Sequence, residues 1–245
     1  MTNQQVGNGR SKFRFSIRSL LVLTAVLSVV LAAIGASRHR DQRRRLMMEQ
    51  YHHAGADIRL AAWSDEIVQL STWRPREFGV QRIVREAPQL RVLRIFYHCD
   101  DEILDQISRL EHLEELRITD RTRSDQQVNV TDQGMASIAR LKSLRVLEIN
   151  DCGGITDAGM AFLSTLPNLE TIEMPYSSIG DEGVAQLAKL PSVRTLVLNG
   201  TSTTNRSLDY LRSTSTLRVL FIGSAVTNPA IEKFKQDTSV LLVRQ

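Results

Sequence analysis

The stretch of the sequence with the most potential for chemistry is His98–Asp101 (His-Cys-Asp-Asp), which places an imidazole, a thiol and two carboxylates side by side. Groups of these types can bind a metal ion, or supply a nucleophile with its base. No second cluster of histidine, cysteine or acidic residues has the spacing to complete such a site. The pair His52-His53 does not complete one either, because adjacent side chains on a helix point about 100° apart. We therefore predict no catalytic residue, no metal and no cofactor, with a site near His98–Asp101 as the alternative.

The short motifs of common catalytic sites are also missing. The sequence contains no phosphate-binding P-loop, no Gly-x-Ser-x-Gly turn, no His-Glu-x-x-His helix and no Cys-x-x-Cys pair. Its two cysteines, Cys99 and Cys152, are too few for a disulfide scaffold, and we predict that both are small, partly buried side chains. We expect that this chain is not an enzyme.

Charge is distributed unevenly along the 245 residues. The net charge is +4, but residues 1–45 hold nine of the 31 lysines and arginines and a single acidic residue, Asp41. The other 200 residues therefore carry 22 basic and 26 acidic side chains. A nucleic-acid interface needs basic side chains gathered on the folded body. The sequence thus predicts no nucleic-acid partner.

The N-terminal part of the chain predicts a membrane anchor. Residues 20–36 carry no charge, and a helix of this length spans about 26 Å, close to the roughly 30 Å of a bilayer core. We predict a disordered basic N-terminus over residues 1–18, a transmembrane helix or signal anchor over 19–37, and a basic juxtamembrane linker over 38–64. A cleaved signal peptide and a buried soluble helix are the alternatives. The membrane-flanking residues are Arg14, Arg18, Arg38, Arg40, Arg43, Arg44 and Arg45.

These flanking charges do not determine the orientation of the anchor. Four lysines and arginines precede the apolar run and five follow it, whereas the positive-inside rule depends on an asymmetry between the two flanks. The sequence therefore predicts a single-pass membrane protein and leaves the side of the folded body open.

Residues 65–245 repeat one unit. The stretches 144–168 and 169–192 each begin with an apolar-x-x-apolar-x-apolar strand pattern, pass through a polar turn and end a helix near Leu-Pro. Such a period indicates a solenoid. The strand pattern begins at Ile67, Leu90, Leu113, Leu144, Leu169, Val193 and Leu217, and a shorter copy follows at 240–243. The first unit is irregular, and we predict that it caps the solenoid with Trp63, Trp73 and Phe78.

An aspartate or asparagine stands at the start of each predicted helix from residue 101 onward. We predict that these residues are N-caps, because a side-chain oxygen at that position accepts a free backbone N–H of the first turn. They are Asp101, Asp132, Asp157, Asp181, Asn205 and Asn228. A glycine follows two residues later in three units, where we expect a tight turn, at Gly134, Gly159 and Gly183. Inward-facing helix residues are predicted at Met160, Leu163, Leu166, Val184, Leu187 and Leu190.

The segment from Leu144 to Leu163 has the pattern L-x-x-L-x-I-x-x-C-x-x-I-T-D-x-G-M-x-x-L. It resembles a leucine-rich repeat of the cysteine-containing or ribonuclease-inhibitor-like subtype, and the resemblance covers residues 67–243. The N-terminal KFRFSIRSLLVL is similar to the start of small membrane-anchored repeat proteins of certain bacteria. The resemblance implies an α/β solenoid of about seven repeats, with a parallel sheet on the concave face and helices on the convex face. It implies no particular reaction.

In such a solenoid the residues between the strand leucines face outward on the concave side, because side chains alternate along a strand. We predict that this face binds an unidentified protein partner. Its predicted contact residues are Arg94, Phe96, Arg117, Glu148, Asn150, Glu173, Asn199 and Phe221. The two phenylalanines are expected hot spots. A second candidate is the insertion of residues 121–127, with Arg121 and Arg123. The alternative function is that of an envelope-associated scaffold without a discrete partner.

Overall fold

The computed structural model describes residues 17–61, 66–72, 80–96, 98–119 and 128–244, with side chains described from Leu27 onward. The chain divides into two compact units, Met1–Met47 and Met48–Gln245. Several predicted residues lie outside the described part: the expected cap residues Trp63, Trp73 and Phe78, the insertion residues Arg121 and Arg123, and the side chains of Arg14 and Arg18.

Helix α1 (Ile17–His53) begins in the first unit, and the predicted apolar segment lies within it. Within residues 27–36 the apolar side chains are exposed, among them Leu27, Val29 and Leu31. The basic residues that follow are exposed at Arg38, Arg40, Arg43 and Arg45 and half-buried at Arg44. Among the residues that the structure describes, no helix combines the length and the apolar character needed to cross a membrane. The predicted segment 19–37 begins before Leu27, and its first side chains lie outside the described part of the chain.

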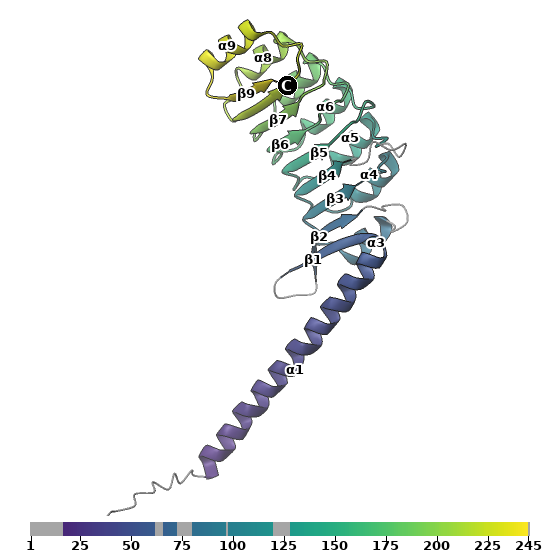
Figure 1. Cartoon of the computed structure of the whole chain (residues 1–245), viewed down its shortest axis with the longest axis vertical. Coiled ribbons are helices and arrows are strands. Elements are labelled where there is room, and N and C mark those ends of the chain that lie inside the picture. Colours follow the sequence, from purple (N-terminus) through teal and green to yellow (C-terminus); the bar gives the residue numbers. More distant parts are fainter. Residues whose placement is uncertain (1–16, 62–65, 73–79, 97, 120–127, 245) are drawn as a thin grey trace, which may run out of the picture. The chain divides into compact units, whose positions relative to one another are not determined.

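The second unit is built on one sheet whose strands follow each other in sequence order (Figure 1). Strand β1 pairs antiparallel with β2, and each later strand pairs parallel with the one before it. The predicted strand series from Ile67 onward is thereby confirmed. The strands are β1 (Ala56–Leu60), β2 (Ile67–Thr72), β3 (Val92–Phe96), β4 (Glu115–Thr119), β5 (Val146–Ile149), β6 (Thr171–Glu173), β7 (Thr195–Leu198), β8 (Val219–Ile222) and β9 (Leu241–Arg244).

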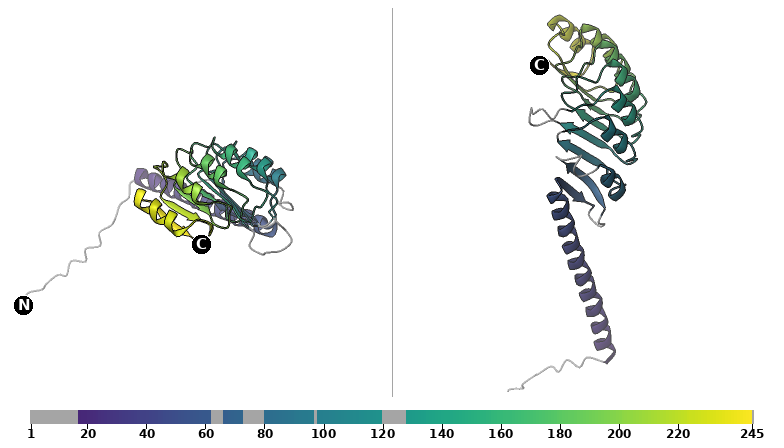
Figure 2. Two further views of the ribbon diagram at one scale, coloured as in Figure 1. Left: turned by 90° about the horizontal axis from the view of Figure 1, so that it is seen from above. Right: turned by 90° about the vertical axis from the view of Figure 1, so that its right-hand side faces the viewer.

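A helix joins each parallel strand to the next. Figure 2 shows these helices on the outer side of the curved stack and the strands on its inner side. The predicted α/β solenoid, with a parallel sheet on the concave face and helices on the convex face, is therefore confirmed for this unit. The helices are α3 (Val80–Glu86), α4 (Asp101–Ile107), α5 (Asp132–Ile138), α6 (Asp157–Leu163), α7 (Asp181–Leu187), α8 (Asn205–Leu211) and α9 (Asn228–Asp237).

The core lies between the sheet and the helices. Equivalent positions of successive strands supply one line of it, and these side chains are fully buried: Leu93, Leu116, Leu147, Ile172, Leu196 and Leu220. The six helix residues predicted to face inward, from Met160 to Leu190, are buried as well. Cys99 and Cys152 are free thiols in this core, and burial, assisted by the neighbouring Asp151, raises the pKa of Cys152 to about 12. Both cysteines are thus more deeply buried than predicted.

Strand β1 follows directly from the end of α1. Gly55 has a φ of 85°, a left-handed conformation that lets the chain leave the helix and enter the strand. β1 then pairs antiparallel with β2, so that the N-terminal edge of the parallel series is covered by a strand outside the repeat pattern. The repeat pattern of the sequence does not predict this strand.

The aspartates at the helix starts do not cap their own helices, so the predicted N-cap role of Asp157 and its equivalents is wrong. Each is the first residue of its helix, and the N-cap is the residue before it, such as Thr156 before α6. Asp132 reaches instead into the next repeat. Its carboxylate accepts the backbone N–H of Thr156 at 2.9 Å and the Thr156 hydroxyl at 2.7 Å. The aspartate therefore joins two repeats, and the threonine caps the helix.

The same link recurs along the helix starts. Asp101 accepts from Thr131, Asp181 from Thr204, and Asn205 from Thr227. Asp157 accepts the backbone N–H of Gly180 at 2.6 Å. We call this series, which consists of Asp101, Asp132, Asp157, Asp181 and Asn205, the inter-repeat clamp. Most of its bonds end on a carboxylate, and such charge-assisted bonds are stronger than neutral ones.

Glycine at the third helical position makes room for the inter-repeat clamp. A Cβ atom on Gly159 would lie 2.4 Å from Oδ1 of Asp132, and Gly134 and Gly183 stand equally close to the clamp residue before them. Close approach, and not the expected tight turn, explains these glycines. In α8 the position is Ser207, whose hydroxyl donates to Asp181. Burial would raise the pKa of Asp181, but the hydrogen bonds from Ser207 and Thr204 outweigh it and lower that pKa.

Candidate protein-binding surface

The face of the sheet that carries no helix presents two rows of partly exposed side chains. Alternation along each strand sends the residues between them into the core. The strand register aligns the first row as Gln69, Val92, Glu115, Val146, Thr171, Thr195, Val219 and Leu241. It aligns the second row as Ser71, Arg94, Arg117, Glu148, Glu173, Val197, Phe221 and Val243. Together the two rows form a surface that crosses every parallel strand.

The predicted contact residues lie on or beside these rows. Five of them belong to the second row: Arg94, Arg117, Glu148, Glu173 and Phe221. Phe96 stands at the end of β3 opposite Thr119, and it is half-buried. Asn150 and Asn199 directly follow β5 and β7. The structure thus brings the five second-row residues into one line and places the other three at the strand ends.

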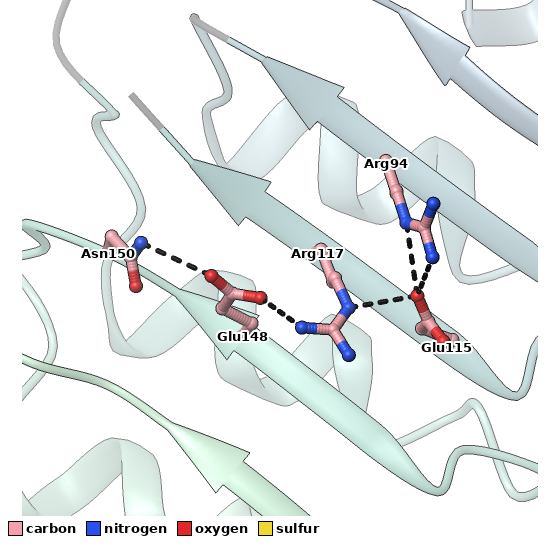
Figure 3. A network of polar contacts seen from close by, with 5 residues as sticks. All are labelled: Arg94, Glu115, Arg117, Glu148 and Asn150. Atoms are coloured by element: carbon pink, nitrogen blue, oxygen red, sulfur yellow. Dashed lines mark hydrogen bonds and ion pairs between the residues drawn. The ribbon is translucent and has the colours of Figure 1, made fainter. Parts of the chain in front are cut away.

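The charged side chains form a continuous network over β3, β4 and β5 (Figure 3). Arg94 donates to Oε1 of Glu115 at 2.9 Å, and Arg117 donates to the same oxygen at 2.9 Å. The other end of Arg117 donates to Glu148 at 2.6 Å. Asn150 donates to the remaining oxygen of Glu148 at 3.3 Å. The network therefore alternates cation and anion across three strands.

These contacts change the protonation equilibria of the network. Burial disfavours the charged form of Glu115, but hydrogen bonds from Arg94 and Arg117 outweigh it, so the pKa of Glu115 lies below its ordinary value. Burial likewise opposes the charge of Arg117, but its bonds to Glu115 and Glu148 raise the pKa of Arg117. Both shifts favour the charged forms of Glu115 and Arg117. Each side chain also restricts the rotamers of its neighbour, so that this part of the surface is preorganised.

The character of the surface changes after β6. The second row continues with Val197, Phe221 and Val243, and the first row continues with Thr195, Val219 and Leu241. Leu241 is 62% exposed, which is high for a leucine in a strand. The surface therefore has a charged half on β3 to β5 and an apolar half on β7 to β9.

Glu173 lies at the boundary between the two halves. Its neighbours in the second row are Glu148 on one side and Val197 on the other. Burial and the nearby charge of Glu148 raise the pKa of Glu173, and Arg117 opposes them only in part. Within the described part of the chain, the side chain of Glu173 has no hydrogen bond and no ion pair. The other second-row carboxylate, Glu148, is bonded to Arg117.

Sequence reasoning missed three exposed or half-buried residues near this surface. Leu241 and Val243 were not included because the last strand pattern is short, although it continues the repeat. Tyr176 follows β6 with a φ of 58° and is 60% exposed. A left-handed tyrosine is uncommon and costs about 1 to 2 kcal/mol relative to the ordinary backbone conformation. Nothing in the local sequence signals this conformation, although Gly200 occupies the equivalent position one repeat later.

The contacts around His98–Asp101 give its acidic residues structural roles. Asp100 caps α4 by accepting the backbone N–H of Ile103 at 2.9 Å, and Asp101 belongs to the inter-repeat clamp. Cys99 is fully buried, and burial with the nearby aspartates raises the pKa of its thiol. His98 stands 3.9 Å from Asp100. No group of three or more histidine, cysteine or acidic residues with the arrangement of a metal site occurs in the ranges that the structure describes.

Comparison with known proteins agrees with this architecture. Residues 140–164 match the family model for a leucine-rich repeat. The solved structure of an internalin (InlF) from Listeria monocytogenes is similar, with a TM-score of 0.50 and 18% identity over 66% of this chain and 42% of the internalin. Internalin C2 of the same organism gives a TM-score of 0.48 and 18% identity over 73% of this chain and 81% of that one. No curated protein sequence matches.

These similarities bear on the fold alone. The aligned part amounts to less than half the length of the internalin InlF, and the sequence identity is low. The family match covers β5 and α6, and the strands before and after it repeat the same unit in register. The second unit of this chain therefore has the fold of a leucine-rich-repeat solenoid.

Proposed function

We propose that this protein is a protein-binding module that recognises a partner protein on its concave surface. The observation that carries the proposal is the pair of aligned rows, which offer a preorganised charged half beside an exposed apolar half on one rigid sheet. Protein interfaces combine these features: an apolar centre with aromatic anchors and a surrounding polar contact zone. A preformed surface also loses little conformational entropy on binding.

Phe221 is the anchor that we assign to the centre of this interface. It lies in the second row between Val197 and Val243, so its ring has apolar neighbours on both sides. It is only half-buried by the protein itself, and a partner could cover the rest. An aromatic ring in this setting contributes a large contact area with few rotatable bonds.

A site-specific photocrosslinker tests the proposal. We expect that p-benzoylphenylalanine at position 221 of the full chain, expressed in its native host, gives a discrete crosslinked protein band. The matched control is the same substitution at Phe162, an aromatic residue of α6 that is 42% exposed. Equal crosslinking at both positions, or none at position 221, would contradict a partner on the concave surface.

We further propose that residues 19–37 anchor the protein to a membrane. The support is the uncharged run of residues 20–36, with basic residues on both flanks that could contact lipid headgroups. Arg38, Arg40, Arg43 and Arg45, all exposed, would then lie at the membrane surface. The anchor would hold the concave surface close to membrane-associated partners.

Membrane fractionation tests this second proposal. We expect the full chain to stay in the membrane pellet after extraction at alkaline pH. A variant with Leu27→Arg and Leu31→Arg should move to the soluble fraction, because each arginine at the centre of a membrane helix costs about 2.5 to 3.5 kcal/mol. A variant with Leu46→Arg, outside the apolar run, is the control. A full chain that is released by the same extraction would contradict the anchor.

A further inference from the structure

The charged half of the concave surface ends on a carboxylate that has no counterion among the described residues. Across the strands the network runs Arg94, Glu115, Arg117 and Glu148, so that every carboxylate up to this point is bonded to an arginine. Glu173 is the next charged residue of the second row, and no described basic side chain is paired with it. Arg117 bonds Glu115 and Glu148, and among the described residues no hydrogen bond or ion pair joins it to Glu173.

The side of Glu173 away from the network is apolar. Val197 on β7 is its register partner, and Phe221 on β8 is the next residue of the row. Because neighbouring strands lie about 4.8 Å apart, roughly 10 Å separate Glu173 from Phe221 along the row. A half-buried carboxylate with apolar neighbours is poorly hydrated, so a cation brought to it by a ligand would interact more strongly than in open solvent.

We propose that Glu173 receives a lysine or arginine side chain of the partner protein, and that an apolar side chain of the same partner segment packs on Phe221. This inference rests on the proposed function, since it names the chemistry of the partner for the same surface. The added cation would extend the alternating network by one member. It would also neutralise the excess negative charge of the two rows, where three glutamates face two arginines.

The geometry restricts the spacing of the two partner residues. An extended segment rises about 3.3 Å per residue, and alternate side chains point to the same side. Since a lysine or arginine side chain is long and flexible, the basic and the apolar residue should lie two to four positions apart. The partner chemistry is therefore a basic residue followed or preceded at that distance by an aliphatic or aromatic one.

Selection from a random peptide library displayed on phage tests this inference, with the purified full chain in detergent as the target. We expect the enriched peptides to share a basic and an apolar residue at the stated spacing. Their affinity should fall roughly ten-fold to one hundred-fold on Glu173→Gln, the range expected when a hydrogen-bonded ion pair is lost. Phe221→Ala should weaken them as well. Glutamine keeps the shape of Glu173, and thermal unfolding verifies that each variant is folded.

Glu182→Gln is the matched control, because Glu182 is an exposed glutamate on α7 of the same repeat, paired with Arg206. Its binding should equal that of the unmodified chain. Peptides that require Phe221 but carry no basic residue, or that bind Glu173→Gln with unchanged affinity, overturn the inference and leave the concave binding site intact. Peptides that are insensitive to both Glu173 and Phe221, or a selection that enriches none, overturn the inference together with the proposed function.

Discussion

Leu147→Ala is expected to lower the free energy of unfolding by about 2 to 5 kcal/mol, the range for a fully buried leucine that leaves a cavity. Leu147 lies in β5 with Leu116 and Ile172 as its register partners, and all three are inaccessible to solvent. Because a repeat contacts only its neighbours, the cavity weakens the two interfaces on which the cohesion of the whole stack depends. Urea unfolding of the full chain, followed by circular dichroism, measures the change.

Val146→Ala is the control for this substitution. Val146 is the preceding residue of the same strand, but its side chain lies in the first row of the open face and is half-exposed. Val146→Ala should lower the free energy of unfolding by well under half as much as Leu147→Ala, because it removes less buried apolar surface. Equal losses for the two variants would show that β5 does not separate a buried face from an open one.

The strand series could be predicted because the core residues of the strands recur at a regular spacing in the sequence. Leucine or isoleucine recurs at the inward strand position of each unit, and this spacing alone aligns the strands. Strand β1 could not be predicted in this way. It is positioned by the left-handed Gly55 and by antiparallel pairing with β2, and neither belongs to the repeat.

The misassigned N-caps have a physical cause. Threonine and aspartate are both favoured at N-caps, so the pair Thr156-Asp157 is ambiguous as a sequence. The choice is made by the preceding repeat, where Asp132 occupies the space beside Thr156 and binds it from outside. Only the juxtaposition of two repeats reveals that the aspartate joins units while the threonine caps the helix.

The candidate surface could be predicted as a set of positions but not as a network. Alternation along the strands was sufficient to place Arg94, Arg117 and Glu173 on the same face. Which arginine binds which glutamate depends on the register across the 31-residue spacing between Leu113 and Leu144, and on the rotamer that each side chain adopts. Glu173 has no described counterion because the two arginines pair with the other glutamates. The local sequence gives no sign of this.

Asp132→Ala is expected to lower the free energy of unfolding by about 2 to 3 kcal/mol. The carboxylate of Asp132 accepts two hydrogen bonds from Thr156, and bonds to a charged group contribute about 1.5 to 3 kcal/mol each, with partial compensation when water replaces the lost acceptor. The loss should appear in urea unfolding of the full chain. Glu111→Ala in the turn after α4 is a suitable control, since Glu111 is exposed and outside the inter-repeat clamp.

A double-mutant cycle with Gly159→Ala tests whether the glycine exists to accommodate Asp132. A methyl group at position 159 would lie 2.4 Å from Oδ1 of Asp132, so Gly159→Ala alone should destabilise the chain by about 1 to 3 kcal/mol, as overpacking does. In the Asp132→Ala background the nearest remaining neighbour is Cγ of the buried Met135 at 2.9 Å, so the penalty should become smaller without vanishing. The cycle should therefore show a coupling energy of about 1 kcal/mol or more.

Gly153→Ala, at a position with open space around it, should be close to neutral in both backgrounds. Strictly additive effects of Asp132→Ala and Gly159→Ala would mean that the glycine is required for another reason, because removing the carboxylate would then leave the cost of the methyl group unchanged.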